Sequence, residues 1–166
     1  MKKAGTIRLK DLEAELQPLD GFDVPKIDLE QYVTSAHLAS HMIFTAETTY
    51  ADVGQKRVLD LGCGCGILSI ACSLVGASYV LGVDVDPEAL RIAGQNLALL
   101  ETRSDGATIE LVHADIASPS FAHIFMGRRR DSDDEPFFDT VVMNPPFGTK
   151  RKGIDILFLE TACRVS

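Results

Sequence analysis

The sequence lacks several features that would assign it to a large class of proteins. It has no apolar run of the length that a membrane span needs, and its first residues contain no apolar signal segment. Only four cysteines occur, and Cys63 and Cys65 are two residues apart within a glycine-rich turn. This spacing suits neither a disulfide framework nor, without further ligands nearby, a zinc site. We therefore expect no membrane, no secretory signal, no bound metal and a reducing compartment.

Positive charge is also scarce. Lysine and arginine number 16 against 24 acidic residues, which gives a net charge of −8 at pH 7. Such a balance disfavours strong nonspecific binding to nucleic acid by this chain alone. Basic clusters at 128–130 and 150–152 nevertheless keep a nucleic-acid substrate open, provided that a partner or a local field helps.

The composition that is present is globular. The chain has 166 residues, of which 46% are hydrophobic and 24% charged, so we predict one domain with a real core. Within 1–166 we expect a helical extension over about 1–50 and a cofactor-binding core over about 55–166. The segment 117–136, which contains GRRR and DSDDE, is predicted to be a charged surface insertion.

Hydrophobic periodicity divides the chain into two parts. Spacings of three and four predict helices over 8–17 and from 34 or 35 to 50, the second with Leu38, Met42, Ile43 and Ala46 on its apolar side. From residue 57 onward, apolar strands alternate with helices. The strands are expected at 57–61, 78–85, 108–115 and 138–143, and the helices at 67–75, from 87 to about 100, and from 153 onward. This alternation predicts an α/β fold with a Rossmann-like, doubly wound parallel sheet.

A glycine-rich turn follows the first of these strands. Gly62, Gly64 and Gly66 stand between strand and helix, where glycine lets the backbone approach a ligand closely. Asp84 ends the next strand, near the separation of about 20 residues expected for a carboxylate that binds ribose hydroxyls. A dinucleotide pattern would need glycine where Ile67 stands, and no Walker lysine is present. These residues favour a ligand with adenosine but without phosphate.

Two further features complete the predicted site. Asp115 follows the third strand and is expected to bind the adenine amino group, although it is also suited to cap the strand end. The fourth strand runs into MNPPFGTK, where Pro145 and Pro146 stop the strand and stiffen a turn that carries Asn144.

The order of these motifs resembles that of a known family. DLGCGCG, VDVD, HADI and NPPF, in this order, resemble class I methyltransferases that use S-adenosylmethionine. The stretches LEQYVTSAHLASHM and MNPPFGTK resemble the methyltransferase-like protein five family, which forms N6-methyladenosine in small-subunit ribosomal RNA. The resemblance spans essentially the whole chain and implies that Gln31 and Thr34 approach the methionine end of the cofactor. It further implies that the glycine loop is lined by Gly62, Cys65 and Ile67, the ribose bound by Asp84, and the adenine by Asp115 and Ile116.

The resemblance also gives the Asn-Pro-Pro turn a chemical role. An adenine amino group is a weak nucleophile that improves when acceptors hold its hydrogens, and the Asn144 side-chain oxygen and the Pro145 carbonyl are two such acceptors on a stiff turn. We therefore predict Asn144, Pro145, Pro146 and Phe147 as catalytic residues. Phe147 would also stack on an extruded base. Lys150, Arg151 and Lys152 would meet phosphate, or form a solvated loop.

The family also implies features outside the catalytic turn. Its members pair with a small zinc-binding activator subunit through the edge beside the third strand, which implies a heterodimer formed around 108–114 and a nuclear and cytoplasmic location. The family's sheet has later strands that do not occur before Ser166, so we expect the fourth strand at an open edge.

Three hypotheses about function therefore stay open. The first is an RNA adenine-N6 methyltransferase. The second is a protein-glutamine methyltransferase, because a glutamine amide would use the same Asn-Pro-Pro chemistry; Phe147 in place of tyrosine and the QYVT box disfavour it. The third is a shortened, non-catalytic product that binds the activator.

Overall fold

The computed structural model describes residues 7–101, 107–121 and 136–166. Four parallel strands form one sheet in the order β3-β2-β1-β4. The strands are β1 Arg57–Leu61, β2 Tyr79–Asp84, β3 Thr108–His113 and β4 Thr140–Val142. The helices are α1 Leu9–Leu16, α2 Ala36–Thr45, α3 Ile67–Val75, α4 Pro87–Glu101 and α6 Ile154–Val165. The predicted α/β class, the parallel sheet and the placement of β4 at an open edge are confirmed.

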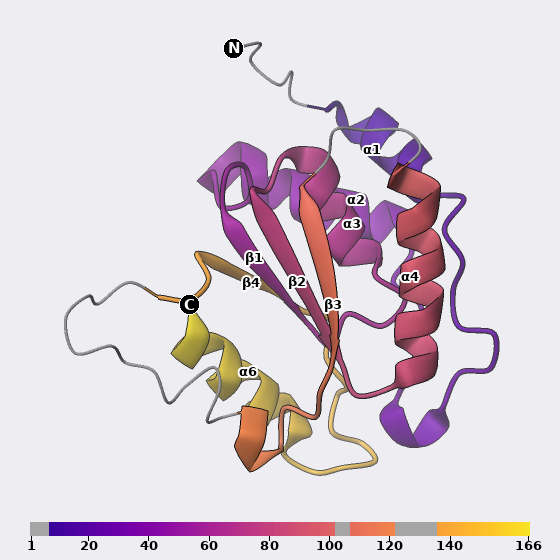
Figure 1. Cartoon of the computed structure of the whole chain (residues 1–166), viewed down its shortest axis with the longest axis vertical. Coiled ribbons are helices and arrows are strands. Elements are labelled where there is room, and N and C mark those ends of the chain that lie inside the picture. The colour runs from indigo at the N-terminus through magenta and orange to yellow at the C-terminus, as the bar shows by residue number, and fades with distance from the viewer. Residues whose placement is uncertain (1–6, 102–106, 122–135) are drawn as a thin grey trace.

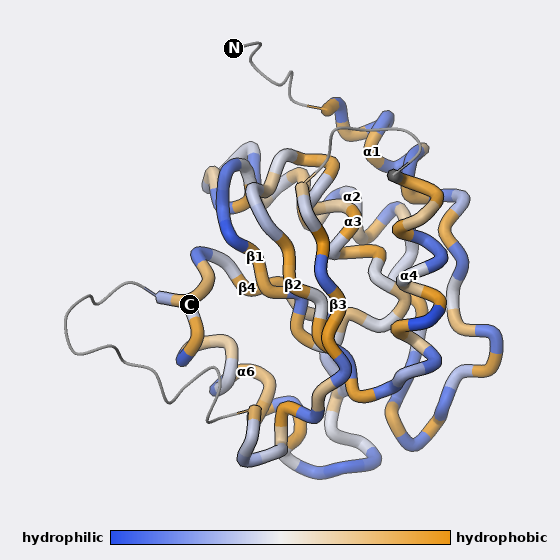
Figure 2. The backbone as a smooth tube through the Cα atoms, viewed as in Figure 1, coloured by the Kyte–Doolittle hydropathy of each residue, from blue (hydrophilic) through white to orange (hydrophobic). Residues whose placement is uncertain are grey.

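The sheet is covered by helices on both faces (Figure 1). On one face, side chains such as Val58 and Val80 pack against α1, α2 and α3. On the other face, alternate residues such as Leu59, Leu81 and Val83 pack with Phe158 of α6. The hydropathy of the chain follows this arrangement, since β1 and β2 are mostly apolar whereas β3 alternates (Figure 2). The sheet thus has a well-covered centre and a more exposed edge at β3.

Some predicted element bounds are wrong in informative ways. The second helix leaves the α-helical pattern at Ala46 and ends in a π-helical turn over Ala46–Tyr50. Leu38, predicted on its apolar side, is 54% exposed, because α2 turns Ala39, Ser40 and Ile43 toward the core. The fourth strand is shorter than predicted, since Phe138 donates its backbone N–H to the carbonyl of Val165 in α6 instead of joining β1.

The charged insertion lies mostly outside the described residues. Residues 122–135 are not described, and the part of 117–136 that is described consists of a turn, helical residues at 119–121, and Pro136 before β4. Among the described residues, no helix is both long and apolar enough to cross a membrane.

A carboxylic acid is buried in the middle of the sheet. Asp60 of β1 is fully buried, and its Oδ2 accepts hydrogen bonds from the Ser69 backbone N–H at 2.9 Å and from the Ser69 hydroxyl at 2.6 Å. Its Oδ1 has no hydrogen-bond partner among the described residues. Burial raises the pKa of Asp60 to about 7, although the bonds from Ser69 act in the opposite direction.

This burial predicts a specific pH dependence of stability. The unfolded chain loses the Asp60 proton near its ordinary pKa of about 3.9, whereas the folded chain keeps it until about 7. Between these values the folded state binds more protons, so the free energy of unfolding should fall as pH rises, and level off above 7. Asp60→Asn should lack this decline. Urea denaturation of both proteins at pH 5, 6 and 8 tests the prediction, and parallel curves would contradict it.

Candidate functional site

A crevice opens where the strands end at their carboxyl termini. It lies between the glycine turn after β1, the end of β2, the turn after β3 and the Asn-Pro-Pro turn after β4. Its remaining walls come from α6 and from residues 17–35, which connect α1 to α2 and which we call the strap. The predicted site residues that line it are Gln31, Thr34, Gly62, Cys65, Ile67, Asp84, Asp115, Ile116, Asn144, Pro146 and Arg151.

The glycine turn lines the crevice and contains three positions that have no side chain. Gly62, Gly64 and Gly66 all have positive φ, at 76°, 52° and 84°. A Cβ atom at Gly62 would lie only 2.8 Å from the ring of Phe158 in α6. The backbone N–H groups of Gly62 and Cys63 donate to the carbonyl of Val83, which ties the turn to β2. Only glycine gives this turn both its left-handed conformation and its closeness to α6.

Asp84 stands at the end of β2 and faces the crevice. Its Oδ2 accepts from the Gly64 N–H at 2.8 Å, and its Oδ1 accepts from the Asp86 N–H at 2.8 Å. Burial raises the pKa of Asp84, although these backbone bonds oppose the rise. A carboxylate has about four lone-pair sites, so Asp84 fixes the turn and keeps acceptor capacity for hydroxyl groups in the crevice.

The strap is fastened to α4 along one side of the crevice. Asn96 of α4 is fully buried and exchanges hydrogen bonds with the backbone of Asp20, and its Nδ2 also donates to the Cys65 carbonyl. Lys26 and Gln31 both donate to the buried carboxylate of Asp86. Burial alone would raise the pKa of Asp86, but the bonds from Lys26 and Gln31 lower it overall. The strap is therefore a fixed wall of the crevice.

The Asn-Pro-Pro turn closes the opposite side. The Asn144 Nδ2 donates to the Thr34 hydroxyl oxygen at 2.8 Å, which leaves Oδ1 as an acceptor. That Oδ1 accepts from the Tyr32 hydroxyl at 2.6 Å, and the same hydroxyl lies 3.5 Å from the Pro145 carbonyl oxygen. The Asn144 oxygen and the Pro145 carbonyl thus converge on one donor position.

Aromatic stacking completes this corner. The rings of Tyr32 and Phe147 are 5.6 Å apart between centroids and inclined by only 11°. Phe147 is 69% exposed and does not itself line the crevice, but it stacks on Tyr32, which does. Glu30 of the strap holds the segment that follows Pro146. Its carboxylate accepts from the backbone N–H groups of Phe147 at 3.1 Å and Lys150 at 2.8 Å. These bonds, that from Lys150 first, lower the pKa of Glu30.

Comparison with known proteins is consistent with this geometry. A family model described as ribosomal protein L11 methyltransferase (PrmA) matches residues 34–124. The rRNA N(6)-adenosine-methyltransferase METTL5 of Danio rerio is 43% identical over 157 residues, which cover 94% of this chain and 69% of the relative. The Drosophila melanogaster protein of that name is 41% identical over 161 residues, which cover 96% of this chain and 69% of the relative. This chain belongs to the METTL5 family of methyltransferases.

A solved structure agrees with the fold of this METTL5-family chain. A crystal structure from Pyrococcus horikoshii, described as a candidate RNA methyltransferase, is 34% identical with a TM-score of 0.75. The match covers 96% of this chain and 70% of that one. The PrmA match, in contrast, ends before Asn144, so it concerns the glycine turn, Asp84 and Asp115 but not the Asn-Pro-Pro corner.

The contacts of several residues in this METTL5-family site differ from those expected. Ser35 caps α2 by accepting from the Leu38 N–H, whereas the neighbouring Thr34 hydroxyl accepts from the Asn144 amide. The Asp115 Oδ1 accepts from the Ala117 N–H, so the residue does cap its turn while also lining the crevice. Lys150, Arg151 and Lys152 are exposed.

The two cysteines of the METTL5-family glycine turn are small buried residues. Cys63 and Cys65 are 7% and 8% exposed, and both are free thiols. Burial raises the pKa of Cys65 to about 12, so its thiol stays protonated at neutral pH.

Sequence reasoning did not assign roles to Tyr32 or Glu30. Tyr32 belongs to the QYVT stretch, but nothing local indicates that its hydroxyl reaches a turn 112 residues away. Glu30 reaches that turn from a left-handed backbone conformation with φ of 51°, which is uncommon for a residue other than glycine. That conformation carries no sequence signal of its own.

Proposed function

We propose that this chain transfers a methyl group from S-adenosyl-L-methionine to N6 of an adenosine in small-subunit ribosomal RNA. Membership of the METTL5 family supports the reaction class, and the Danio rerio and Drosophila melanogaster relatives, which are rRNA N(6)-adenosine-methyltransferases by name, support an rRNA adenosine as the substrate. The single observation that carries the proposal is the convergence of the Asn144 oxygen and the Pro145 carbonyl on one hydrogen-bond donor beside the face of Phe147. An adenine amino group is a donor attached to a flat ring, and this corner accepts that combination.

The residues of the crevice suit S-adenosylmethionine, which would supply an activated methyl group on a sulfonium. Asp84 would accept bonds from the ribose hydroxyls, and Ile116 and Asp115 would border the adenine ring and its amino group. Gly62, Cys65 and Ile67 would line the path between them, with Gln31 and Thr34 at the methionine end. Because Gly62 has no side chain, the cofactor could approach the backbone of the glycine turn closely.

In the proposed reaction, Asn144 and Pro145 act by holding the two hydrogens of the target amino group. Acceptors at fixed positions stabilise the positive charge that grows on nitrogen as it attacks the methyl carbon. Thr34 orients the Asn144 amide so that its oxygen, and not its nitrogen, faces the substrate. No strong base is needed in this corner, because the proton can leave to solvent after the methyl group has moved.

We further propose two features that the family implies. One is a heterodimer with a small zinc-binding activator subunit, formed by addition of a strand at β3. In support, β3 is an edge strand, and Val112 on it is 36% exposed. The partner would also help an acidic chain to bind RNA. The other feature is a nuclear and cytoplasmic location.

Nucleoside analysis tests the proposed function. The chain, alone and with the activator, is incubated with methyl-labelled cofactor and either small-subunit rRNA or a glutamine-containing peptide. We expect labelled N6-methyladenosine after digestion of the RNA. Label in the peptide alone would support a protein-glutamine methyltransferase, and no label with retained activator binding would support a non-catalytic product.

A further inference from the structure

Tyr32 occupies the position in which the proposed function puts the target base. Its hydroxyl donates to Asn144 Oδ1 at 2.6 Å and lies 3.5 Å from the Pro145 carbonyl oxygen, the two acceptors assigned to the adenine amino group. Its ring stacks on Phe147, the surface assigned to the adenine ring. One side chain therefore reproduces both the hydrogen bonding and the stacking of the substrate.

Resting on the proposed function, we propose that Tyr32 is a substrate mimic that the incoming adenine must displace. The Tyr32 side chain and the target adenine cannot both hydrogen-bond to Asn144 Oδ1 while both stack on the same face of Phe147. Tyr32 is 39% exposed, so its ring has solvent to move into, whereas Gln31 and Thr34 on either side of it are held by Asp86 and Asn144. The side chain can leave while the strap stays. Thr34 already orients Asn144, so the Tyr32 hydroxyl only occupies the acceptor, and the incoming base must break that bond before it can bind.

Removing only the hydroxyl tests this competition. Tyr32→Phe keeps the stacked ring but loses the bond to Asn144, so adenine entry no longer has to break that bond. We expect KM for RNA to fall about 2- to 10-fold, the equivalent of one neutral hydrogen bond, with kcat unchanged. Tyr50→Phe is the control, because Tyr50 is 68% exposed and does not line the crevice. A raised KM or a lowered kcat in Tyr32→Phe would overturn the proposal, since Tyr32 would then assist the base.

A second readout separates this inference from the proposed function. The sequence contains three tyrosines, so ring signals of ¹³C-labelled tyrosine can be assigned by substitution. Adenosine monophosphate should shift the Tyr32 signals and leave those of Tyr50 in place. Turnover of RNA with unmoved Tyr32 signals would overturn the displacement alone. Absence of RNA methylation by the wild-type chain would contradict the proposed function, whatever the Tyr32 signals do.

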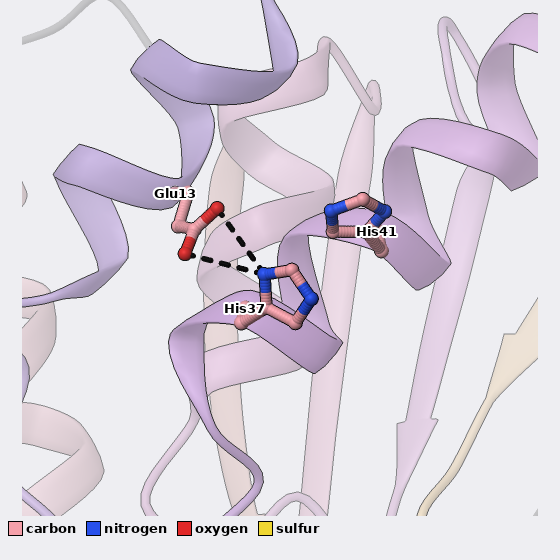
Figure 3. Close-up of side chains that lie close together, drawn as sticks. All are labelled: Glu13, His37 and His41. Carbon is pink, nitrogen blue, oxygen red and sulfur yellow. Dashed lines mark hydrogen bonds and ion pairs between the residues drawn. The ribbon is translucent and has the colours of Figure 1, made fainter.

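An independent cluster lies on the helices that anchor the strap. Glu13 of α1 and His37 and His41 of α2 face one another across the helix pair (Figure 3). The His37 Nδ1 lies 3.3 Å from a Glu13 oxygen, the two imidazole rings are 4.3 Å apart, and one ligand atom from each residue lies within 4.8 Å of the others. Glu13 is partly buried, which restricts its carboxylate, and both histidines lie on the same helical face.

We propose that these three residues bind a divalent transition metal ion of the zinc class. Two ligands on a tetrahedral zinc ion lie about 3.3–3.5 Å apart at ordinary bond lengths, and the His37–Glu13 separation already matches. A His41 nitrogen lies within 4.8 Å of the other two ligand atoms, so binding of the ion would draw it closer. Imidazole with a carboxylate suits zinc better than calcium or magnesium. Because Glu13 and His37 stand on either side of residues 17–35, the ion would fix both ends of the strap.

Thermal unfolding of the whole chain tests this site, with zinc ions alone as the probe. We expect zinc to raise the Tm and EDTA to reverse the rise. His41→Ala should weaken zinc binding by calorimetry at least about 10-fold, since losing a direct ligand costs no less than losing a supporting group. His113→Ala, on β3, should bind zinc like the wild type. Zinc binding that is unchanged in His41→Ala, or no Tm shift in the wild type, would overturn the site.

Discussion

Replacing Asn144 with alanine should lower the rate of methyl transfer by about 10²- to 10³-fold, the usual loss when one preorganised group at the reacting atoms is removed. The side chain supplies one of the two acceptors that converge on the amino position, and its orientation is fixed by Thr34. Affinity for the cofactor should change little, because the proposed arrangement puts Asn144 beside the methyl group and Asp84 and Ile116 beside the nucleoside; all three residues line the crevice. Single-turnover kinetics and calorimetry on the same preparation measure the two quantities separately.

Thr34→Val provides the matched comparison for Asn144. It preserves the size and branching of the side chain but removes the oxygen that accepts from the Asn144 amide. We expect a smaller loss of rate than in Asn144→Ala when the two variants are compared at saturating cofactor, since Thr34 is also proposed to lie at the methionine end of the cofactor. If Asn144→Ala lost cofactor affinity in proportion to its rate, the role of Asn144 as an acceptor for the substrate would be contradicted.

Replacing Asp84 with alanine should weaken cofactor binding and, unlike Asn144→Ala, leave the rate at saturating cofactor largely intact. The variant loses the acceptor that we propose for the ribose hydroxyls, and it also leaves the backbone N–H groups of Gly64 and Asp86 without their bonds to Asp84. Hydrogen bonds to a charged group contribute about 1.5–3 kcal/mol, so the Kd of the cofactor should rise roughly 10- to 150-fold. With saturating cofactor, much of the rate should return. The Asn144 and Asp84 variants therefore separate catalysis from binding.

A carboxylate outside the crevice serves as the control for Asp84. Asp11 of α1 is paired with Arg8 on the surface, so Asp11→Asn should leave the cofactor Kd unchanged. Calorimetric titration with S-adenosylhomocysteine measures all three proteins. An unchanged Kd in Asp84→Ala would mean that the ribose binds elsewhere.

Features that depend on local sequence were predictable. The bounds of β1 and of α3 match those expected, because an apolar strand, three glycines and a terminal Gly76 mark them without reference to the rest of the chain. The place of Asn144 beside the glycine turn was also predictable, since parallel strands bring their carboxyl ends to the same edge. The element bounds follow from local sequence, and the place of Asn144 follows from the strand order of the class I methyltransferases that the motifs resemble.

Features that depend on distant contacts were not predictable. The bonds of Tyr32 and Glu30 to the Asn-Pro-Pro turn join residues more than 100 positions apart, and Lys26 and Gln31 of the strap reach Asp86 across more than 50 positions. Leu38 illustrates the same limit, because helical periodicity does not say how α2 rotates against α1 and α3. The side chains that hold the strap recur at no regular spacing in the sequence, so hydrophobic periodicity does not reveal them.

A crystal structure of the chain with bound S-adenosylmethionine tests the central claim most directly. In the proposed reaction, N6 of the target adenine lies within hydrogen-bond distance of Asn144 Oδ1 and within about 3–3.5 Å of the methyl carbon of the cofactor. The methyl carbon should therefore lie no more than about 6.5 Å from Asn144 Oδ1, with the ribose against Asp84. A methyl group that points away from Asn144, or a cofactor bound outside the crevice, would contradict the account.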